Sequence, residues 1–224
     1  MTRILILGGT REAAELAAEL VAEVHDVTTS LAGRTKEPAL VAGNVRIGGF
    51  GGAQGLAQWL TENGIERLID ATHPFAKQIS RNATEAAVAT GVEFERLERP
   101  PWQKHTDDKW HEVITLEHAA AAVPAGARAL LALGGQHLSA FATRADVHFV
   151  IRMIDPPETP LPFVQHDLIL DRPSQDWREE AKLLEAKLIT HIVARNSGGD
   201  GAYAKIEAAR KLGVPVIMIE RPKP

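Results

Sequence analysis

The residues best suited to chemistry lie in the segment Asp70-Ala71-Thr72-His73-Pro74, which directly follows the apolar pair Leu68-Ile69. Proline suits the first position of a helix, because its missing N–H would have no partner there. The sequence therefore predicts that His73 caps a helix beginning at Pro74 and lies at the carboxyl end of a strand. Chemistry in open α/β sheets concentrates at such ends. The alternative is that the polar residues of this segment only cap the helix and close its turn.

A second candidate site is the turn Gly8-Gly9-Thr10, which lies between the apolar run 4–7 and a helical pattern of apolar residues. Glycine lets a pyrophosphate approach the backbone closely, and the N–H groups at a helix start donate to it. The turn departs from the Gly-x-Gly-x-x-Gly pattern, because Thr10 and Ala13 stand where the later glycines would be. We predict that this turn and Arg11 bind the phosphates of a dinucleotide, with a plain tight turn as the alternative.

The end of the next strand, predicted over residues 26–30, is where dinucleotide-binding folds contact the adenosine ribose. Ser30, Gly33 and Arg34 offer a hydroxyl, space and a guanidinium there, whereas an acid would favour NAD. A guanidinium pairs well with the 2′-phosphate of NADP. These residues therefore predict NADP binding, and the alternative is an ordinary surface arginine.

A comparable loop in the second half of the chain is Arg195-Asn196-Ser197-Gly198-Gly199, which precedes a predicted helix carrying Lys205. Asn196 and Ser197 can hydrogen-bond a carboxylate, the glycines allow close approach, and a helix N-terminus adds positive potential. We expect an anion-binding loop on the substrate side here, with a flexible solvent loop as the alternative. The stretch Gly134-Gly135 shows a similar pattern.

Strands and helices that could position these sites alternate along the whole chain. Short apolar runs bounded by glycine and proline are typical of buried parallel strands. We predict strands over residues 4–7, 26–30, 45–47, 67–70, 92–96, 112–114, 129–133, 147–153, 167–170, 191–194 and 214–219. Helical spacing of apolar residues predicts helices after Thr10, around Trp59, after Pro74, and over residues 177–188 and 202–212.

This alternation predicts the α/β fold class, with two Rossmann-like three-layer domains whose sheets are mainly parallel. The polar, proline-bearing stretch 98–108 interrupts the pattern and marks a boundary. We therefore expect an N-terminal NADP-binding domain over residues 1–105, a C-terminal domain over residues 106–224, and a substrate cleft between them.

Composition excludes several classes of function. The 224 residues include no cysteine, which removes disulfides, thiolate nucleophiles and iron–sulfur clusters. The nine histidines show no spacing typical of metal ligands, so we predict no metal site. The net charge of −4 argues against a nucleic-acid partner. Because no apolar run reaches the roughly 18 residues of a membrane span, we expect a cytoplasmic protein.

Taken together, these motifs resemble the precorrin-6A reductase family over nearly the whole chain. The segment Asp70 to Ala76 is the most specific element, and Ile79-Ser80-Arg81-Asn82-Ala83, Arg99-Pro100-Pro101-Trp102 and the Asn-Ser-Gly-Gly loop follow it in the expected order. The resemblance implies an NADPH-dependent reduction of precorrin-6A to precorrin-6B in cobalamin biosynthesis. The alternatives are a cobalt-precorrin-6A reductase and a non-catalytic NADP sensor.

The resemblance and the residues together suggest individual roles. We expect His73 to donate the proton that accompanies hydride transfer, supported by Asp70 and Thr72, and we expect Thr72, His73 and Pro74 also to line the NADPH site. The tetrapyrrole substrate bears many carboxylates, and the candidate residues that bind it are Arg81, Arg99, Lys104, Arg195, Asn196, Ser197, Gly198 and Lys205. Neighbouring enzymes of the corrin pathway are candidate partners. The chain departs from the family pattern at Asp171-Arg172-Pro173, where Gly-Pro-Phe is frequent, and at Arg195, where lysine is common.

Overall fold

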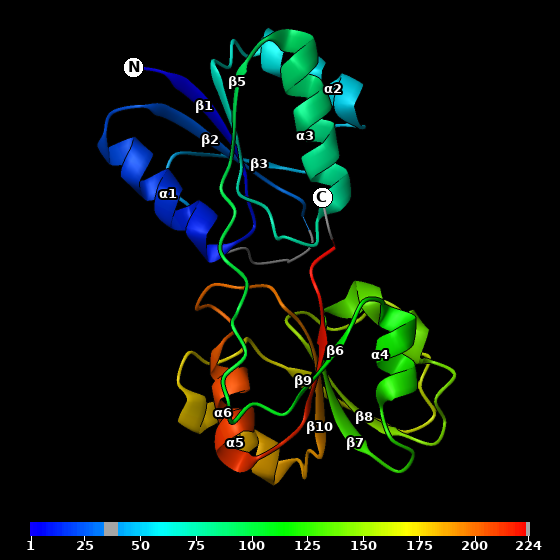
Figure 1. Cartoon of the computed structure of the whole chain (residues 1–224). Coiled ribbons are helices and arrows are strands. Elements are labelled where there is room, and N and C mark those ends of the chain that lie inside the picture. Colours follow the sequence, from blue (N-terminus) through cyan, green and yellow to red (C-terminus); the bar gives the residue numbers. More distant parts are fainter. Residues whose placement is uncertain (34–39, 223–224) are drawn as a thin grey trace. The chain divides into compact units, whose positions relative to one another are not determined.

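The chain folds into two compact units, Met1–Arg99 and Pro100–Pro224 (Figure 1). The structure is a computed structural model that describes residues 1–33 and 40–222. Each unit contains one parallel sheet flanked by helices, which confirms the predicted α/β class with two Rossmann-like domains. The division falls before Pro100, whereas the sequence suggested a boundary after residue 105. Trp102 explains the difference, because its side chain is buried in the core of the second unit.

The first unit has a five-stranded sheet in the order β3-β2-β1-β4-β5, and all its neighbouring strands are parallel. The strands are β1 (Arg3–Leu7), β2 (Asp26–Leu31), β3 (Asn44–Ile47), β4 (Arg67–Asp70) and β5 (Glu93–Arg96). The helices are α1 (Arg11–Ala22), α2 (Ala53–Glu62) and α3 (Lys77–Thr90).

Strand β1 shows why this unit has three layers. Successive side chains of a strand point to opposite faces of the sheet. Ile4 and Ile6 pack with Ala17 of α1, whereas Leu5 and Leu7 pack with residues of α2 and α3. Figure 1 shows α1 on one side of this sheet and α2 with α3 on the other. A continuous apolar run is therefore buried on both faces, as the sequence predicted.

The second unit has a six-stranded parallel sheet in the order β6-β11-β10-β7-β8-β9. The strands are β6 (Trp110–Val113), β7 (Arg128–Ala132), β8 (His148–Met153), β9 (His166–Leu170), β10 (His191–Arg195) and β11 (Val216–Ile219). The helices are α4 (Leu116–Ala122), α5 (Trp177–Ala186) and α6 (Ala204–Leu212), with short 3-10 turns at Gly135–His137 and Ser139–Phe141.

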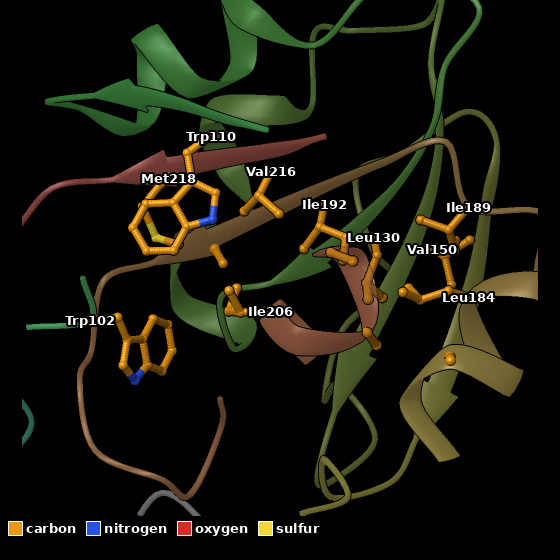
Figure 2. Packing of buried hydrophobic residues seen from close by; sticks show 14 residues of the cluster. Trp102, Trp110, Leu130, Val150, Leu184, Ile189, Ile192, Ile206, Val216 and Met218 are labelled. Carbon is orange, nitrogen blue, oxygen red and sulfur yellow. The ribbon is translucent and has the colours of Figure 1, made fainter. Parts of the chain in front are cut away.

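One core of the second unit lies between the sheet and helices α5 and α6. Leu184 of α5 and Ile206 of α6 are buried against apolar residues of the strands (Figure 2). The labelled strand residues of this cluster are Trp110, Leu130, Val150, Ile192, Val216 and Met218. Trp102 joins the same cluster from outside the sheet, so the segment after the boundary is anchored in this unit.

All the predicted strands are present, with small shifts at their ends. The sequence did not predict α4, a short helix capped by the Thr115 side chain. It also extended α5 to Leu188, but this helix ends at Ala186. Leu188 has a φ of 52°, a left-handed conformation that an α-helix does not contain.

The predicted helix start at Pro74 is wrong. Helix α3 begins at Lys77, and its N-cap is Ala76, not His73. The Ala76 N–H donates to the His73 carbonyl at 2.7 Å, which closes a tight turn through Pro74 and Phe75. Because Ala76 has a φ of −87° and a ψ of 50°, the turn does not continue directly into the helix.

Candidate active site

The carboxyl ends of β1 and β4 form the topological switch point of the first sheet. From β1 the chain continues through β2 and β3 on one side, and then returns to β4 and β5 on the other. Open α/β sheets bind ligands outside the strand ends at such a point. Gly8 follows β1 and Ala71 follows β4. The Thr10 hydroxyl donates to the Ala71 carbonyl at 2.8 Å, so the two predicted motifs of this unit lie side by side.

The turn after β1 has the properties that a bound phosphate requires. A side chain at Gly8 would bring a Cβ within 2.7 Å of the Thr29 methyl carbon, which explains the glycine there. Gly9 has a φ of 102°, and a Cβ added to it would meet no atom within 4 Å. The Thr10 hydroxyl caps α1 by accepting the Ala13 N–H at 3.1 Å. Open space over a glycine and a capped helix start fit a pyrophosphate.

Arg99 lies beside the start of α1, where it pairs with a carboxylate. Its Nη1 is 2.5 Å from Glu12 Oε2. Burial raises the pKa of Glu12, but hydrogen bonds from Arg99 and local groups outweigh burial and lower the pKa below its usual value. Glu12 is therefore ionised at neutral pH, and Arg99 offsets a negative charge that would oppose a phosphate at this helix end. The sequence suggested Arg99 for the substrate and did not predict this ion pair.

Asp70 organises the turn that carries His73. Its side chain is 1% exposed, and Oδ1 accepts both the Thr72 N–H at 3.1 Å and the Thr72 hydroxyl at 2.6 Å. Oδ2 has no hydrogen-bond partner in the described part of the chain, and the nearest cationic group is Arg96 Nε at 3.8 Å. Asp70 and Thr72 therefore hold the backbone in front of His73 in one conformation.

The His73 ring is oriented by its own turn. The Phe75 N–H donates to His73 Nδ1 at 3.3 Å. An acceptor nitrogen of a neutral imidazole carries no proton, so Nε2 carries the proton of the neutral ring. His73 is only partly exposed, and its ring lies 5.7 Å from that of Phe75. Pro74 is buried within the turn.

Ser30 and Gly33 lie at the end of β2, where the sequence suggested the ribose site. Ser30 is 7% exposed, and Gly33 has a φ of 71°. Arg34, the predicted ligand of the 2′-phosphate, lies outside the described residues. Arg46 of β3 was not predicted for this site, although its Nη1 is 3.4 Å from Ser30 Oγ. The glycine-rich stretch 48–52 that follows this arginine was the available signal.

The second sheet has its own switch point, between β7 and β10. Gly134 and Gly135 follow β7, and the loop 196–199 follows β10. Arg195 Nη2 donates to the Leu133 carbonyl at 3.1 Å, which connects the two strand ends. The two glycine loops that the sequence singled out in this half therefore flank one strand-end site.

Asn196 has a structural role that the sequence did not reveal. Its Oδ1 accepts the Trp102 N–H at 2.8 Å, and its Nδ2 donates to the Trp102 carbonyl at 3.0 Å. Trp102 Nε1 donates to the Gly199 carbonyl at 2.7 Å. A Cβ at Gly198 would lie 2.2 Å from the Pro100 carbonyl oxygen, so only glycine fits there. These contacts fix the loop against segment 100–102, and Ser197, 8% exposed, lies within it.

A cluster of buried charges lies near this loop. Arg152 of β8 makes two hydrogen bonds to Glu180 of α5, at 3.0 and 2.9 Å. Lys205 of α6 is 5% exposed and donates to the Ala202 carbonyl at 2.6 Å. The pKa of Lys205 is lowered to about 8, mainly by burial; Glu180 opposes this shift, and the nearby charges of Arg152 and Arg195 add to it. The cluster thus holds three cationic groups and one carboxylate, a balance that favours an added anion.

The other predicted substrate residues lie at the surface. Arg81 is exposed on α3 and forms no ion pair with any residue in the ranges 1–33 and 40–222. Lys104 is exposed, and its Nζ donates to the Trp110 carbonyl at 3.2 Å. Within the described residues, no group of three or more acidic or histidine side chains is arranged to hold a metal ion. No helix in those residues is both long and apolar enough to cross a bilayer.

Comparison with known proteins gives similarities over almost the full length. The family model described as "Precorrin-6x reductase CbiJ/CobK" matches residues 3–224. A precorrin-6A reductase of Rhodobacter capsulatus is 47% identical over 223 residues, which cover 99% of this chain and 89% of that protein. A cobalt-precorrin-6A reductase of Priestia megaterium is 31% identical, covering 98% and 91% of the two chains. The solved structure "CobK precorrin-6A reductase" is 46% identical and covers 100% of this chain and 89% of its own, with a TM-score of 0.96.

Proposed function

Because this chain belongs to the precorrin-6x reductase family, we propose that it reduces precorrin-6A to precorrin-6B with NADPH, a step of cobalamin biosynthesis. The observation that carries the proposal is the 47% identity to a precorrin-6A reductase over 99% of the chain. The geometry supports it independently, because the turn after β1 and the turn of His73 meet at a switch point suited to a nucleotide.

The first unit would hold the cofactor through backbone and polar groups. Gly8, Gly9, Thr10 and the N–H groups at Arg11 would bind the pyrophosphate, and Thr72 with Pro74 would border the nicotinamide end. Ser30, Gly33 and Arg34 would contact the adenosine ribose and its phosphate. When bound, NADPH supplies the hydride. The open space over Gly9 and the capped start of α1 are the observations that fit this group.

His73 would supply the proton that balances the hydride, since reduction of an unsaturated unit adds both. The ring donates from Nε2 when both of its nitrogens carry a proton. A proton on Nδ1 breaks the hydrogen bond that Nδ1 accepts from the Phe75 N–H. Asp70 and Thr72 would position this turn and would not contact the substrate. Their hydrogen bonds fix the backbone, so the imidazole is held in place before the substrate arrives.

The second unit would bind the carboxylates of the tetrapyrrole. Arg195, Ser197 and Lys205 lie at or beside the loop after β10, and the buried cluster there has more positive than negative groups. Gly198 and the side chain of Asn196 would act by shaping this loop. Exposed Arg81 and Lys104, together with Arg99, remain proposed outer contacts for further carboxylates. Charge-assisted hydrogen bonds of this kind are about twice as strong as neutral ones.

Identity to the relatives favours the metal-free substrate. Relatives named precorrin-6A reductase reach 47% and 46% identity, whereas those named cobalt-precorrin-6A reductase reach 31% and 29%. We therefore propose that precorrin-6A is reduced faster than its cobalt-containing counterpart.

An anaerobic assay with both substrates tests this function. The full chain is mixed with NADPH and either precorrin-6A or cobalt-precorrin-6A, and loss of the reduced-nicotinamide absorbance is followed beside a substrate-free control and an NADH reaction. We expect rapid oxidation with precorrin-6A and a product heavier by two hydrogen atoms. Binding of NADPH without oxidation would support a sensor instead, and faster reaction of the cobalt compound would reverse the substrate assignment.

A further inference from the structure

Arg46 is held rigidly at the carboxyl edge of the first sheet. Its Nη1 donates to the Gly48 carbonyl at 2.5 Å, and its Nη2 donates to the Gly49 carbonyl at 2.8 Å. The guanidinium carbon lies 3.8 Å from the ring centroid of Phe50, so one face of the group is covered by an aromatic ring. A guanidinium with two backbone acceptors and a stacked ring has little freedom left to lose when a ligand binds.

The fold places this guanidinium beside the end of β2. Arg46 pairs with Ser30 in the parallel register of β2 and β3, and its Nη1 is 3.4 Å from Ser30 Oγ. Ser30 lies about 20 residues after Gly8, where dinucleotide-binding folds carry the residue that contacts the ribose 2′ position. An acidic residue at that position favours NAD, whose ribose has a free 2′-hydroxyl. A nearby arginine accommodates the 2′-phosphate of NADP.

Within residues 1–33 and 40–222, no carboxylate neutralises the charge of Arg46. No Asp or Glu oxygen in the described parts of the chain lies within 4.0 Å of its nitrogens, and the side chain is half-buried. A guanidinium has five N–H donors. Two carbonyls and the Ser30 hydroxyl engage three of them, so with respect to the described residues two donors stay available for anionic oxygens.

We propose that Arg46 is a specificity-determining residue, which with Ser30 selects a nucleotide carrying a 2′-phosphate over one with a free 2′-hydroxyl. This inference rests on the proposed NADPH function and adds a residue to it. Phe50 and the loop carbonyls of Gly48 and Gly49 position the guanidinium, and its fixed charge provides the discrimination.

Adenosine 2′,5′-bisphosphate and 5′-AMP test the inference without the tetrapyrrole. Both are titrated calorimetrically into the full-length wild type, R46M, R46K and the control R3M, whose arginine lies at the opposite, amino end of β1. We expect R46M to bind the bisphosphate about 10- to 100-fold more weakly, the range expected for hydrogen bonds to a charged group. We also expect its 5′-AMP affinity to stay within about twofold of wild type, and R3M to match wild type for both ligands.

The outcomes separate the inference from the function on which it rests. If wild type shows no preference for the bisphosphate, the proposed NADPH specificity itself fails. If wild type shows the preference and R46M keeps it, or loses affinity for both ligands equally, Arg46 is only structural and the inference is overturned. R46K keeps a positive charge near Ser30 and a long side chain. We therefore expect it to fold and to retain part of the preference for the bisphosphate. Equal affinities of R46K for the two ligands would also overturn the inference.

Discussion

Replacing Lys205 by methionine is expected to make the stability of the protein less dependent on pH. Lys205 is 5% exposed on α6, and its ammonium group donates to the Ala202 carbonyl. Methionine fills a similar volume without a charge. In wild type, burial is the main cause that lowers the pKa of Lys205 from 10.5 to about 8. The folded state therefore disfavours the charged lysine that the unfolded chain accepts freely.

The magnitude follows from these two pKa values. Each pKa unit corresponds to about 1.4 kcal/mol, so the difference between 10.5 and about 8 amounts to about 3 kcal/mol. Below the folded pKa this penalty is fully present. As pH rises from about 8 to 10.5, the native state has released the proton that the unfolded state still binds, and the free energy of unfolding of wild type increases. K205M lacks this increase, and loss of the Ala202 hydrogen bond costs it about 1 kcal/mol at every pH.

Urea unfolding of wild type, K205M and the control K211M measures the effect at about pH 7 and about pH 10. Lys211 lies on the same helix but is exposed. We expect K205M to exceed wild type by about 2 kcal/mol near neutral pH and to lose that advantage in alkali, while K211M follows wild type. A stability gap between K205M and wild type that stays constant with pH would show that a lowered Lys205 pKa does not reduce the stability of wild type. K205M should also raise KM for the tetrapyrrole, because a buried cation has been removed.

Three further predictions concern other parts of the molecule. H73A should lower kcat by about 100-fold or more, a much larger change than the one in Kd for NADPH, which loses one bordering side chain, and wild-type turnover would remove His73 as the proton donor. R34A should weaken NADPH binding by about 1.5–3 kcal/mol and leave NADH binding unchanged. Equal increases in KM for both cofactors would exclude a contact of Arg34 with the 2′-phosphate. R152M should lose about 3–5 kcal/mol in urea unfolding because it leaves Glu180 buried without its partner. R152M/E180L should recover most of that loss, and a double variant as unstable as R152M would show that the unpaired Glu180 is not the cause.

Local patterns predicted the elements of both sheets. Short apolar runs bounded by glycine and proline indicate the buried strands, and the first of these, residues 4–7, is buried on both faces of β1. The glycine turn after β1 was also predicted, because its backbone conformation is encoded within a few contiguous residues. The helix start near Pro74 was predicted wrongly, since proline at a helix start and proline in a tight turn look the same in sequence.

The partners of the polar side chains could not be predicted. Asn196 looked like a ligand for a carboxylate, yet its amide binds the backbone of Trp102, 94 residues away in sequence. Arg46 carried no signal of its own until parallel pairing of β2 with β3 placed it beside Ser30. Hydrogen-bond partners far apart in sequence depend on strand order and register, which local periodicity does not specify.

The α/β alternation, the glycine turns at the strand ends and the family follow from the sequence alone, because each is encoded in short, contiguous patterns. Which charged groups are buried, and what they contact, depends on how the elements pack together. Lys205 reads as one of many surface lysines until α6 packs against the second sheet and removes its ammonium from water. Desolvation and pairing depend on all the surrounding elements together, so no local pattern in the sequence specifies them.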